Sequence, residues 1–287
     1  MKRFLFAIIS IFIVVGCSGQ AVEPTPVVRD VQVTLVNSEI TPGFSRIAIA
    51  LFDSNNQFIH DAEVEFEYFD LTDIDNPVSE SSATAVTRQT ADGFTTIYTH
   101  FRTLERAGSW GLQVNASFPD GSIAQQGIAF QVVTEAVSFP VGLKAPPVDT
   151  LTRAVVDDIS LITTAFEPVP AFYDLSIRDA LENEKPTIIY FSTPAFCQTR
   201  LCAPGYEELA DFHEDAANEY NFVHIEVFEG LPNPAESGWP LAPAMVAFGL
   251  TTEPWLYVVD ASGTVVMRLE GLFTAAELQE TLPEVLQ

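Results

Sequence analysis

The sequence has little positive charge, few cysteines and no long hydrophobic run, and each shortage excludes some classes of function. Its 287 residues include 13 Lys and Arg against 39 Asp and Glu, for a formal net charge of −26. Nucleic acid and anionic lipid surfaces are improbable partners of so acidic a chain, because both are bound through basic patches. Any cysteine chemistry must use the three cysteines present, Cys17, Cys197 and Cys202.

The first residues have the pattern of an export signal. A basic start at Lys2 and Arg3 precedes an apolar run, Phe4–Ile13, that is too short to span a bilayer. The run ends in Val14-Val15-Gly16-Cys17, which resembles a lipobox with Val in place of the commoner Leu. The resemblance implies cleavage before Cys17 and a diacylglycerol on that residue. The alternative is a signal peptide without lipidation, or a short N-terminal anchor.

With or without lipidation, this N-terminal pattern predicts that the protein leaves the cytoplasm. We expect a lipoprotein of the cell membrane or the outer membrane that faces the periplasm or the exterior. Residues 1–16 would be the signal peptide, and residues 17–29 the lipidated Cys17 with a small, polar, Pro-containing tether. Once Cys17 is acylated, Cys197 and Cys202 remain as a pair, and in an oxidising compartment such a pair forms a disulfide or a redox couple.

Residues 30–135 alternate between apolar and polar side chains with a period of two. Turn signals such as Asp53-Ser54-Asn55-Asn56 separate the alternating segments. Short strands with regular turns predict an all-β sandwich. The expected strands are 31–36, 46–52, 62–68, 95–99 and 111–115.

Two short motifs in this part, Asp61-Ala62-Glu63-Val64 and residues 107–114, resemble immunoglobulin-like domains of the FixH and YtkA type. Some such domains are linked with copper handling. His60 and His100, however, have no His, Met or Cys neighbours at chelating spacing, so we expect no metal site and place both at the surface or at strand ends.

The pattern changes after residue 135. Residues 136–172 contain repeated prolines and are interpreted as a linker and domain entry, with an extra strand expected near Leu151–Ile162. Residues 173–287 then predict an α/β domain. Its expected helices are 176–182, 203–217 and 275–282, and its expected strands are 187–191, 222–228, 255–259 and 264–269. A hairpin turn at 260–263 and a capping box from Thr274 to Glu277 support this order.

The cysteine pair directly follows a buried strand in this domain. Ile188-Ile189-Tyr190-Phe191 leads to Cys197 and then to Cys202, after which a helix is expected. With Thr251-Thr252-Glu253-Pro254 before a later strand, this order resembles the thioredoxin-like superfamily. The resemblance implies that Cys197 is the nucleophile, that Cys202 is the resolving thiol, and that Pro254 is a cis-proline. The cis-proline would face the cysteines, with Glu253 and Pro254 contacting substrate.

The spacing of the cysteines departs from that family, because four residues, Gln198-Thr199-Arg200-Leu201, separate them instead of two. In one continuous helix such a pair would point about 140° apart, too far for a disulfide. Either the helix begins near Pro204 and leaves both cysteines on a loop, or the segment is helical when reduced and unwinds on oxidation. The buried Asp of thioredoxins is also missing, and its place falls near Tyr190.

Other functions remain open at this point. The four-residue spacing also resembles atypical peroxiredoxins of the bacterioferritin-comigratory type, although Thr193 is one residue out of place. A Sco-type copper chaperone would use a Cys pair together with a His. The cysteines of Sco proteins are separated by three residues, however, and those of this chain by four. His213, expected on an exposed helix face, and His224, within a strand, are interpreted as structural.

The sequence therefore predicts a two-domain lipoprotein in which the β-sandwich has a positioning or recruiting role. Its thioredoxin-like domain would exchange disulfides with a protein or a small thiol, without a cofactor. The alternatives are a thiol peroxidase, or a non-catalytic binding or copper-handling lipoprotein that uses the thioredoxin fold as a scaffold.

Overall fold

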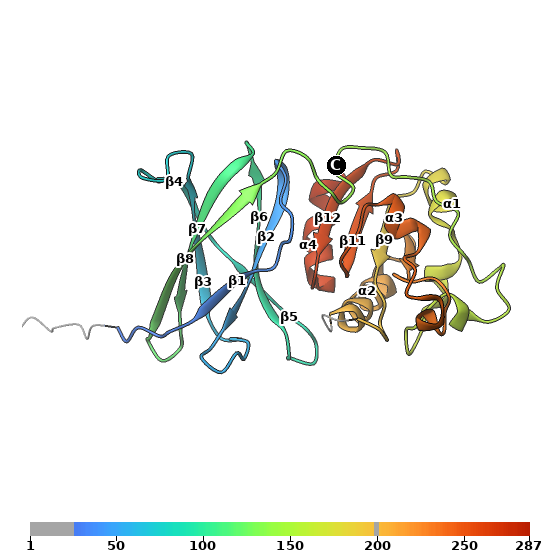
Figure 1. The fold of residues 1–287 in the computed structure, drawn as a ribbon, viewed down its shortest axis with the longest axis horizontal. Coiled ribbons are helices and arrows are strands. Elements are labelled where there is room, and N and C mark those ends of the chain that lie inside the picture. Colours follow the sequence, from blue (N-terminus) through green and yellow to red (C-terminus); the bar gives the residue numbers. More distant parts are fainter. Residues whose placement is uncertain (1–25, 198–200) are drawn as a thin grey trace, which may run out of the picture.

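The computed structural model describes residues 26–197 and 201–287, which form two domains side by side (Figure 1). The predicted signal, Cys17 and residues 198–200 lie outside the described part. Within that part, no helix is both long and apolar enough to cross a membrane. The predicted fold class, an all-β domain followed by an α/β domain, is confirmed.

The N-terminal domain consists of two antiparallel four-stranded sheets packed face to face. Aromatic side chains such as Phe66, Tyr68, Tyr98 and Trp110 fill the space between them. The sheet orders are β1-β2-β6-β5 and β4-β3-β7-β8. The strands are β1 (Gln32–Leu35), β2 (Gly43–Phe52), β3 (Glu63–Asp70), β4 (Val78–Thr84), β5 (Val86–Gln89), β6 (Thr96–Leu104), β7 (Gly108–Ser117) and β8 (Ile123–Val132).

His100 differs from its expected place at a surface or strand end. It lies within β6, half-buried, where its Nδ1 atom is 3.0 Å from the Tyr68 hydroxyl. Burial lowers the pKa of His100 below its ordinary value. His60 is exposed, as expected.

The C-terminal domain has a mixed sheet in the order β10-β9-β11-β12 with helices on both faces. Helices α2 and α4 cover one face, and α1 and α3 cover the other. Strands β9 and β10 are parallel, and β11 is antiparallel to β9 and β12. The elements are α1 (Ile177–Glu182), β9 (Thr187–Phe191), α2 (Cys202–Ala216), β10 (Asn221–Ile225), α3 (Pro243–Ala247), β11 (Trp255–Val259), β12 (Val265–Glu270) and α4 (Ala275–Val285).

The predictions of an extra strand and of a full capping box in this half are wrong. The segment Leu151–Ile162 forms no strand but a turn and irregular backbone with a short 3₁₀ helix, Ile159–Leu161, because several of its apolar side chains point to solvent. The capping box of α4 is only half formed. The Thr274 hydroxyl accepts a hydrogen bond from the Glu277 N–H, but the Glu277 carboxylate pairs with Arg46 of the other domain instead.

Candidate active site

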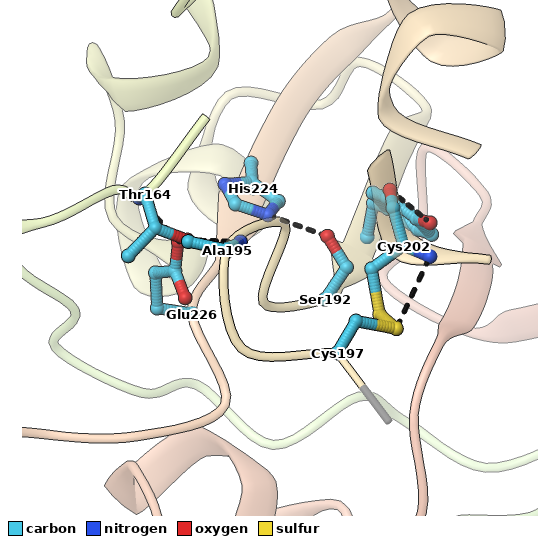
Figure 2. The surroundings of a disulfide bond; sticks show 8 residues. Thr164, Ser192, Ala195, Cys197, Cys202, His224 and Glu226 are labelled. Carbon is cyan, nitrogen blue, oxygen red and sulfur yellow. Dashed lines mark hydrogen bonds between the residues drawn. A yellow bond between two sulfur atoms is a disulfide. The ribbon is translucent and has the colours of Figure 1, made fainter. Parts of the chain in front are cut away.

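The cysteine pair lies where the central strand β9 gives way to helix α2 (Figure 2). All five residues of β9 are buried, which fixes the start of the loop that carries Cys197. Helix α2 begins at Cys202, so the pair is not held within one helix. Cys197 and Cys202 form a disulfide with a Cα–Cα distance of 5.9 Å. The sequence placed the helix start near Pro204 with both cysteines on a loop; in the structure Cys197 does lie on the loop, but the helix already begins at Cys202.

The two cysteines differ in exposure and in hydrogen bonding. Cys202 is fully buried, whereas Cys197 is half-buried and therefore accessible to a partner. The Cys202 N–H points to the Cys197 sulfur, with N and Sγ 3.3 Å apart. A helix N-terminus carries unpaired N–H groups and partial positive charge, both of which stabilise a thiolate at Cys197.

The loop before β11 completes the site. The Glu253–Pro254 peptide bond is cis. The Glu253 carboxylate and the sulfurs of Cys197 and Cys202 all lie within 4.8 Å of one another. The four residues singled out in the sequence, Cys197, Cys202, Glu253 and Pro254, are thus brought together.

Tyr190 lies fully buried beneath the start of α2. Its hydroxyl donates a hydrogen bond to the Cys202 carbonyl oxygen at 3.2 Å, and its ring packs edge-on against Phe273. Burial raises the pKa of Tyr190 far above its ordinary value, so the phenol stays neutral. Where the sequence lacks an Asp, the structure has a neutral hydrogen-bond donor that anchors the helix.

A buried carboxyl group that was not predicted from the sequence lies on the other side of the cysteine loop. Glu226, 6% exposed, accepts hydrogen bonds from the backbone N–H and the hydroxyl of Thr164. The same hydroxyl accepts a hydrogen bond from the N–H of Ala195 on the cysteine loop. Burial raises the pKa of Glu226 to about 7. Glu226 therefore braces the loop through Thr164 (Figure 2).

A positional signal for Glu226 was present in the sequence. The carboxyl ends of parallel strands meet at one edge of a sheet, and functional groups gather at that edge. Glu226 directly follows β10, just as the cysteine loop follows its parallel neighbour β9. The prediction of a strand through residue 228 hid this position.

The two histidines of this domain are both held by the protein. In the buried His224, Nδ1 is 2.9 Å from the Tyr173 hydroxyl and Nε2 is 2.8 Å from the Ser192 hydroxyl. Burial lowers the pKa of His224 to about 3, so the ring is neutral. His213 is not on an exposed face as expected; it is half-buried, with edge-on contacts to Phe172 and Phe222.

Comparison with protein-family models identifies one part of the chain. Residues 173–286 match the model of a family described as a thioredoxin-like domain. No curated protein matches the chain.

Several solved structures are similar to one part of the chain. One is a thiol:disulfide interchange protein of the thioredoxin family from Chlorobium tepidum TLS, with 23% identity, 46% of this chain and 100% of that chain covered, and a TM-score of 0.33. Another is CopC from Methylosinus trichosporium OB3b, with 14% identity, 37% and 97% covered, and a TM-score of 0.25. A third is the third fibronectin III domain of the human KIAA0343 protein, with 16% identity, 42% and 94% covered, and a TM-score of 0.24.

Proposed function

Because residues 173–286 form a thioredoxin-like domain in which Cys197 and Cys202 are joined as a disulfide, we propose that this protein is a thiol–disulfide oxidoreductase. The observation that carries the proposal is the asymmetry of the pair. The half-buried Cys197 receives the N–H of Cys202 at the start of α2, while Cys202 itself is buried. This is the arrangement needed for one attacking and one resolving sulfur.

The reaction transfers two electrons. In the reduced protein, the Cys197 thiolate attacks one sulfur of a substrate disulfide, and the other substrate sulfur leaves as a thiolate that takes a proton. The Cys202 thiolate then attacks Cys197 in the mixed disulfide. This step closes the Cys197–Cys202 bond and releases the substrate as a dithiol. The reverse sequence oxidises a substrate dithiol, and the relative reduction potentials set the direction.

We further propose that the protein acts outside the cytoplasm as a lipoprotein held to a membrane through Cys17. The basic start, the short apolar run and the Gly16-Cys17 ending support this placement. The substrate would be a protein or a small thiol compound of the same compartment. Metabolic labelling with a fatty acid tests the anchor, since Cys17→Ser should abolish the label and release the protein from the membrane fraction.

Alkylation of the reduced protein at different pH values, together with the reduction potential of the pair, tests the activity. Exchange chemistry requires Cys197 to react well below about pH 8.5. It also requires a reduction potential above roughly −300 mV, because structural disulfides lie below that value. An unreactive pair of lower potential would instead indicate a scaffold. Rapid consumption of a hydroperoxide by the reduced protein would replace exchange with thiol peroxidase activity.

A second candidate function, copper handling, rests on the convergence of three ligand atoms. After reduction, Cys197 and Cys202 offer two soft thiolates, and the Glu253 carboxylate lies within the same 4.8 Å cluster. Thiolates favour Cu(I) over harder ions. Titration of the reduced protein with Cu(I) should then give tight one-to-one binding that Cys197→Ser and Cys202→Ser each abolish. Binding that survives either substitution would exclude this site.

A further inference from the structure

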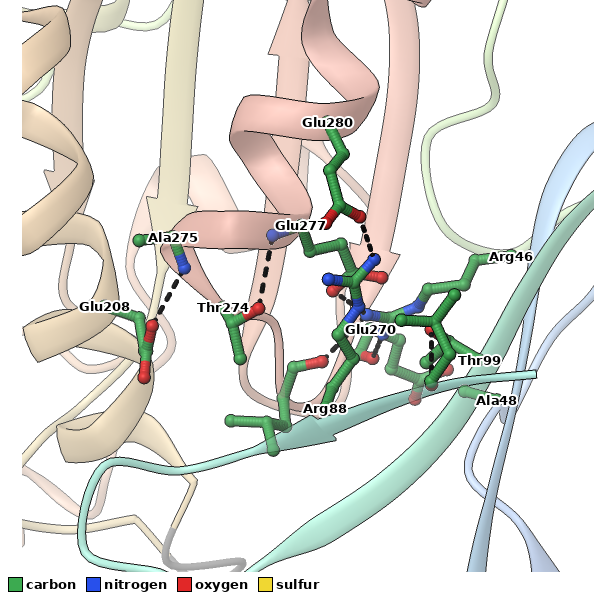
Figure 3. Close-up of polar contacts among 12 residues, drawn as sticks. Arg46, Ala48, Arg88, Thr99, Glu208, Glu270, Thr274, Ala275, Glu277 and Glu280 are labelled. Carbon is green, nitrogen blue, oxygen red and sulfur yellow. Dashed lines mark hydrogen bonds and ion pairs between the residues drawn. The ribbon is translucent and has the colours of Figure 1, made fainter. Parts of the chain in front are cut away.

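Arg46 of the β-sandwich extends into the C-terminal domain, where its guanidinium group is buried (Figure 3). Its Nη1 donates to the Leu272 carbonyl oxygen at 2.8 Å and to the Glu277 carboxylate at 3.0 Å. Its Nη2 donates to the Glu270 carbonyl oxygen. One side chain of the first domain therefore binds the backbone on both sides of Gly271.

Gly271 connects this contact to the candidate active site. Its N–H donates a hydrogen bond to the carbonyl oxygen of the cis-proline Pro254 at 2.9 Å. Its backbone has a φ of +77°, and a Cβ atom on it would lie 3.2 Å from Val36 of the sandwich. The segment that supports Pro254 is thus held tightly between Arg46 and the sandwich surface.

A second contact reaches the cysteine segment itself. Leu201, one residue before Cys202, packs in an apolar cluster across the domain boundary. The cluster contains Leu272 from the second domain and Ala48, Ala50 and Ile97 from the sandwich. The sandwich therefore touches both the residue that precedes the buried cysteine and the support of the cis-proline.

The ion pair between Arg46 and Glu277 suits a role in positioning. The two side chains are 2% and 0% exposed. Burying charges costs free energy, so such pairs add little net stability but strongly favour the one geometry that satisfies them. The planar guanidinium group presents several donors in a fixed fork, which a more flexible side chain cannot reproduce.

On these contacts, we propose that the β-sandwich is part of the redox site and that Arg46 is a positioning residue for the Pro254 loop. Arg46 fixes the carbonyl groups of Glu270 and Leu272, and these fix the Gly271 N–H that holds Pro254. The role of the loop in substrate exchange rests on the proposed function. The contacts from Arg46 through Gly271 to Pro254 do not depend on the proposed function.

Amide hydrogen exchange tests the link without any substrate. The variant Arg46→Met with Glu277→Leu removes the charges together, which spares the protein an unpaired buried ion. We expect the Gly271 amide to exchange about tenfold faster than in the wild type, because charge-assisted hydrogen bonds around it are lost. The amides of β9 should be unchanged. Equal protection of Gly271 in both proteins would overturn the proposal.

Two further variants separate positioning from general stability. Arg46→Lys keeps the charge opposite Glu277, but its single nitrogen cannot replace both Nη1 and Nη2, so it should fold and still speed exchange at Gly271. Glu280→Gln removes the charge from the neighbouring interdomain pair with Arg88, a hydrogen bond that involves none of residues 270–272, and should leave Gly271 protected. Faster exchange at Gly271 in the Glu280→Gln control would show that any weakening of the interface has the same effect, against a specific role of Arg46.

The functional consequence has its own readout. In the double variant, exchange with a peptide disulfide should slow about tenfold, whereas alkylation of Cys197 by iodoacetamide, which needs no Pro254 loop, should keep its rate. Unchanged peptide exchange, or an equal fall in both rates, would contradict positioning by Arg46. If the wild type itself exchanges no disulfide, the proposed function fails, and the Gly271 amide still decides whether the link exists.

Discussion

The Tyr190 hydroxyl occupies the space that a side chain at Gly205 would fill. A Cβ atom at Gly205 would lie 2.2 Å from the phenolic oxygen of Tyr190 and 3.1 Å from the ring carbon that bears it. Gly205 is in the first turn of α2, and the same hydroxyl donates to the carbonyl oxygen of Cys202 at the start of that helix. The absence of a side chain at Gly205 therefore sets how closely α2, with its cysteine, approaches the sheet.

Gly205→Ala should destabilise the protein by about 3 kcal/mol, because the new methyl group overpacks the buried hydroxyl. Tyr190→Phe alone should cost about 1 kcal/mol through the lost hydrogen bond. In the double variant most of the Gly205→Ala penalty should disappear, since the clash is with the oxygen. Urea unfolding of the four proteins measures this coupling, and strictly additive losses would show that the clash is not what destabilises Gly205→Ala.

The raised pKa of Glu226 predicts a specific dependence of stability on pH. The pKa is about 7 in the folded protein against an ordinary 4.5, so the folded state binds this proton more tightly than the unfolded state. The stabilisation is complete below about pH 4.5 and is lost as the pH rises to about 7. Glu226→Gln keeps an oxygen acceptor for Thr164 without the charge. It should match the wild type near pH 4 and exceed its stability above pH 7 by about 3 kcal/mol.

Thermal or urea unfolding across this pH range provides the measurement, with the exposed Glu229→Gln on the same loop as the control. The Glu226→Gln protein should also reveal the titration of His224. Burial lowers the pKa of that ring to about 3, so its stabilisation is present above about pH 6.5 and is lost as the pH falls. A parallel offset between Glu226→Gln and the wild type at every pH would mean that Glu226 does not titrate in this window.

Local patterns in the sequence predicted most of the C-terminal domain. The helix expected over residues 176–182 is present as α1, and the hairpin turn expected at residues 260–263 joins β11 and β12, because both depend on neighbours a few residues apart. Strand β4 of the N-terminal domain was missed because its local sequence has no strand pattern. Its sequence, VSESSAT, is polar and exposed at a sheet edge, so it shows no alternation.

Interactions between distant segments were the main limit of prediction for the candidate site. The cysteines and Pro254 were found because their order along the chain is distinctive. Arg46 and Glu277 are 231 residues apart, and the pairing of their charges depends on how two finished domains meet. Local spacing made Glu277 a cap residue, and only the packed interface shows that its carboxylate faces Arg46 instead.

The difference in exposure between the cysteines predicts different outcomes for their serine variants. Cys197→Ser should abolish exchange, because the buried Cys202 is inaccessible to substrate. Cys202→Ser should instead accumulate a mixed disulfide between Cys197 and substrate, since no resolving sulfur remains. Intact-mass measurement after incubation with a peptide disulfide distinguishes them. Each variant should also lose about 2 kcal/mol of stability with the short disulfide loop. Trapping through Cys202 in the Cys197→Ser protein would reverse the assignment.

The Glu253 carboxylate should restrain the reactivity of the reduced site. It lies within 4.8 Å of both sulfurs, and a neighbouring negative charge opposes formation of a thiolate. Glu253→Gln removes the charge with little change in shape, so Cys197 should react with iodoacetamide about threefold faster at pH 7. The exposed Glu236→Gln is the matched control for a change in net charge. If Glu253→Gln slows alkylation instead, the carboxylate assists the thiol as a base, and the same variant should then also lose exchange activity.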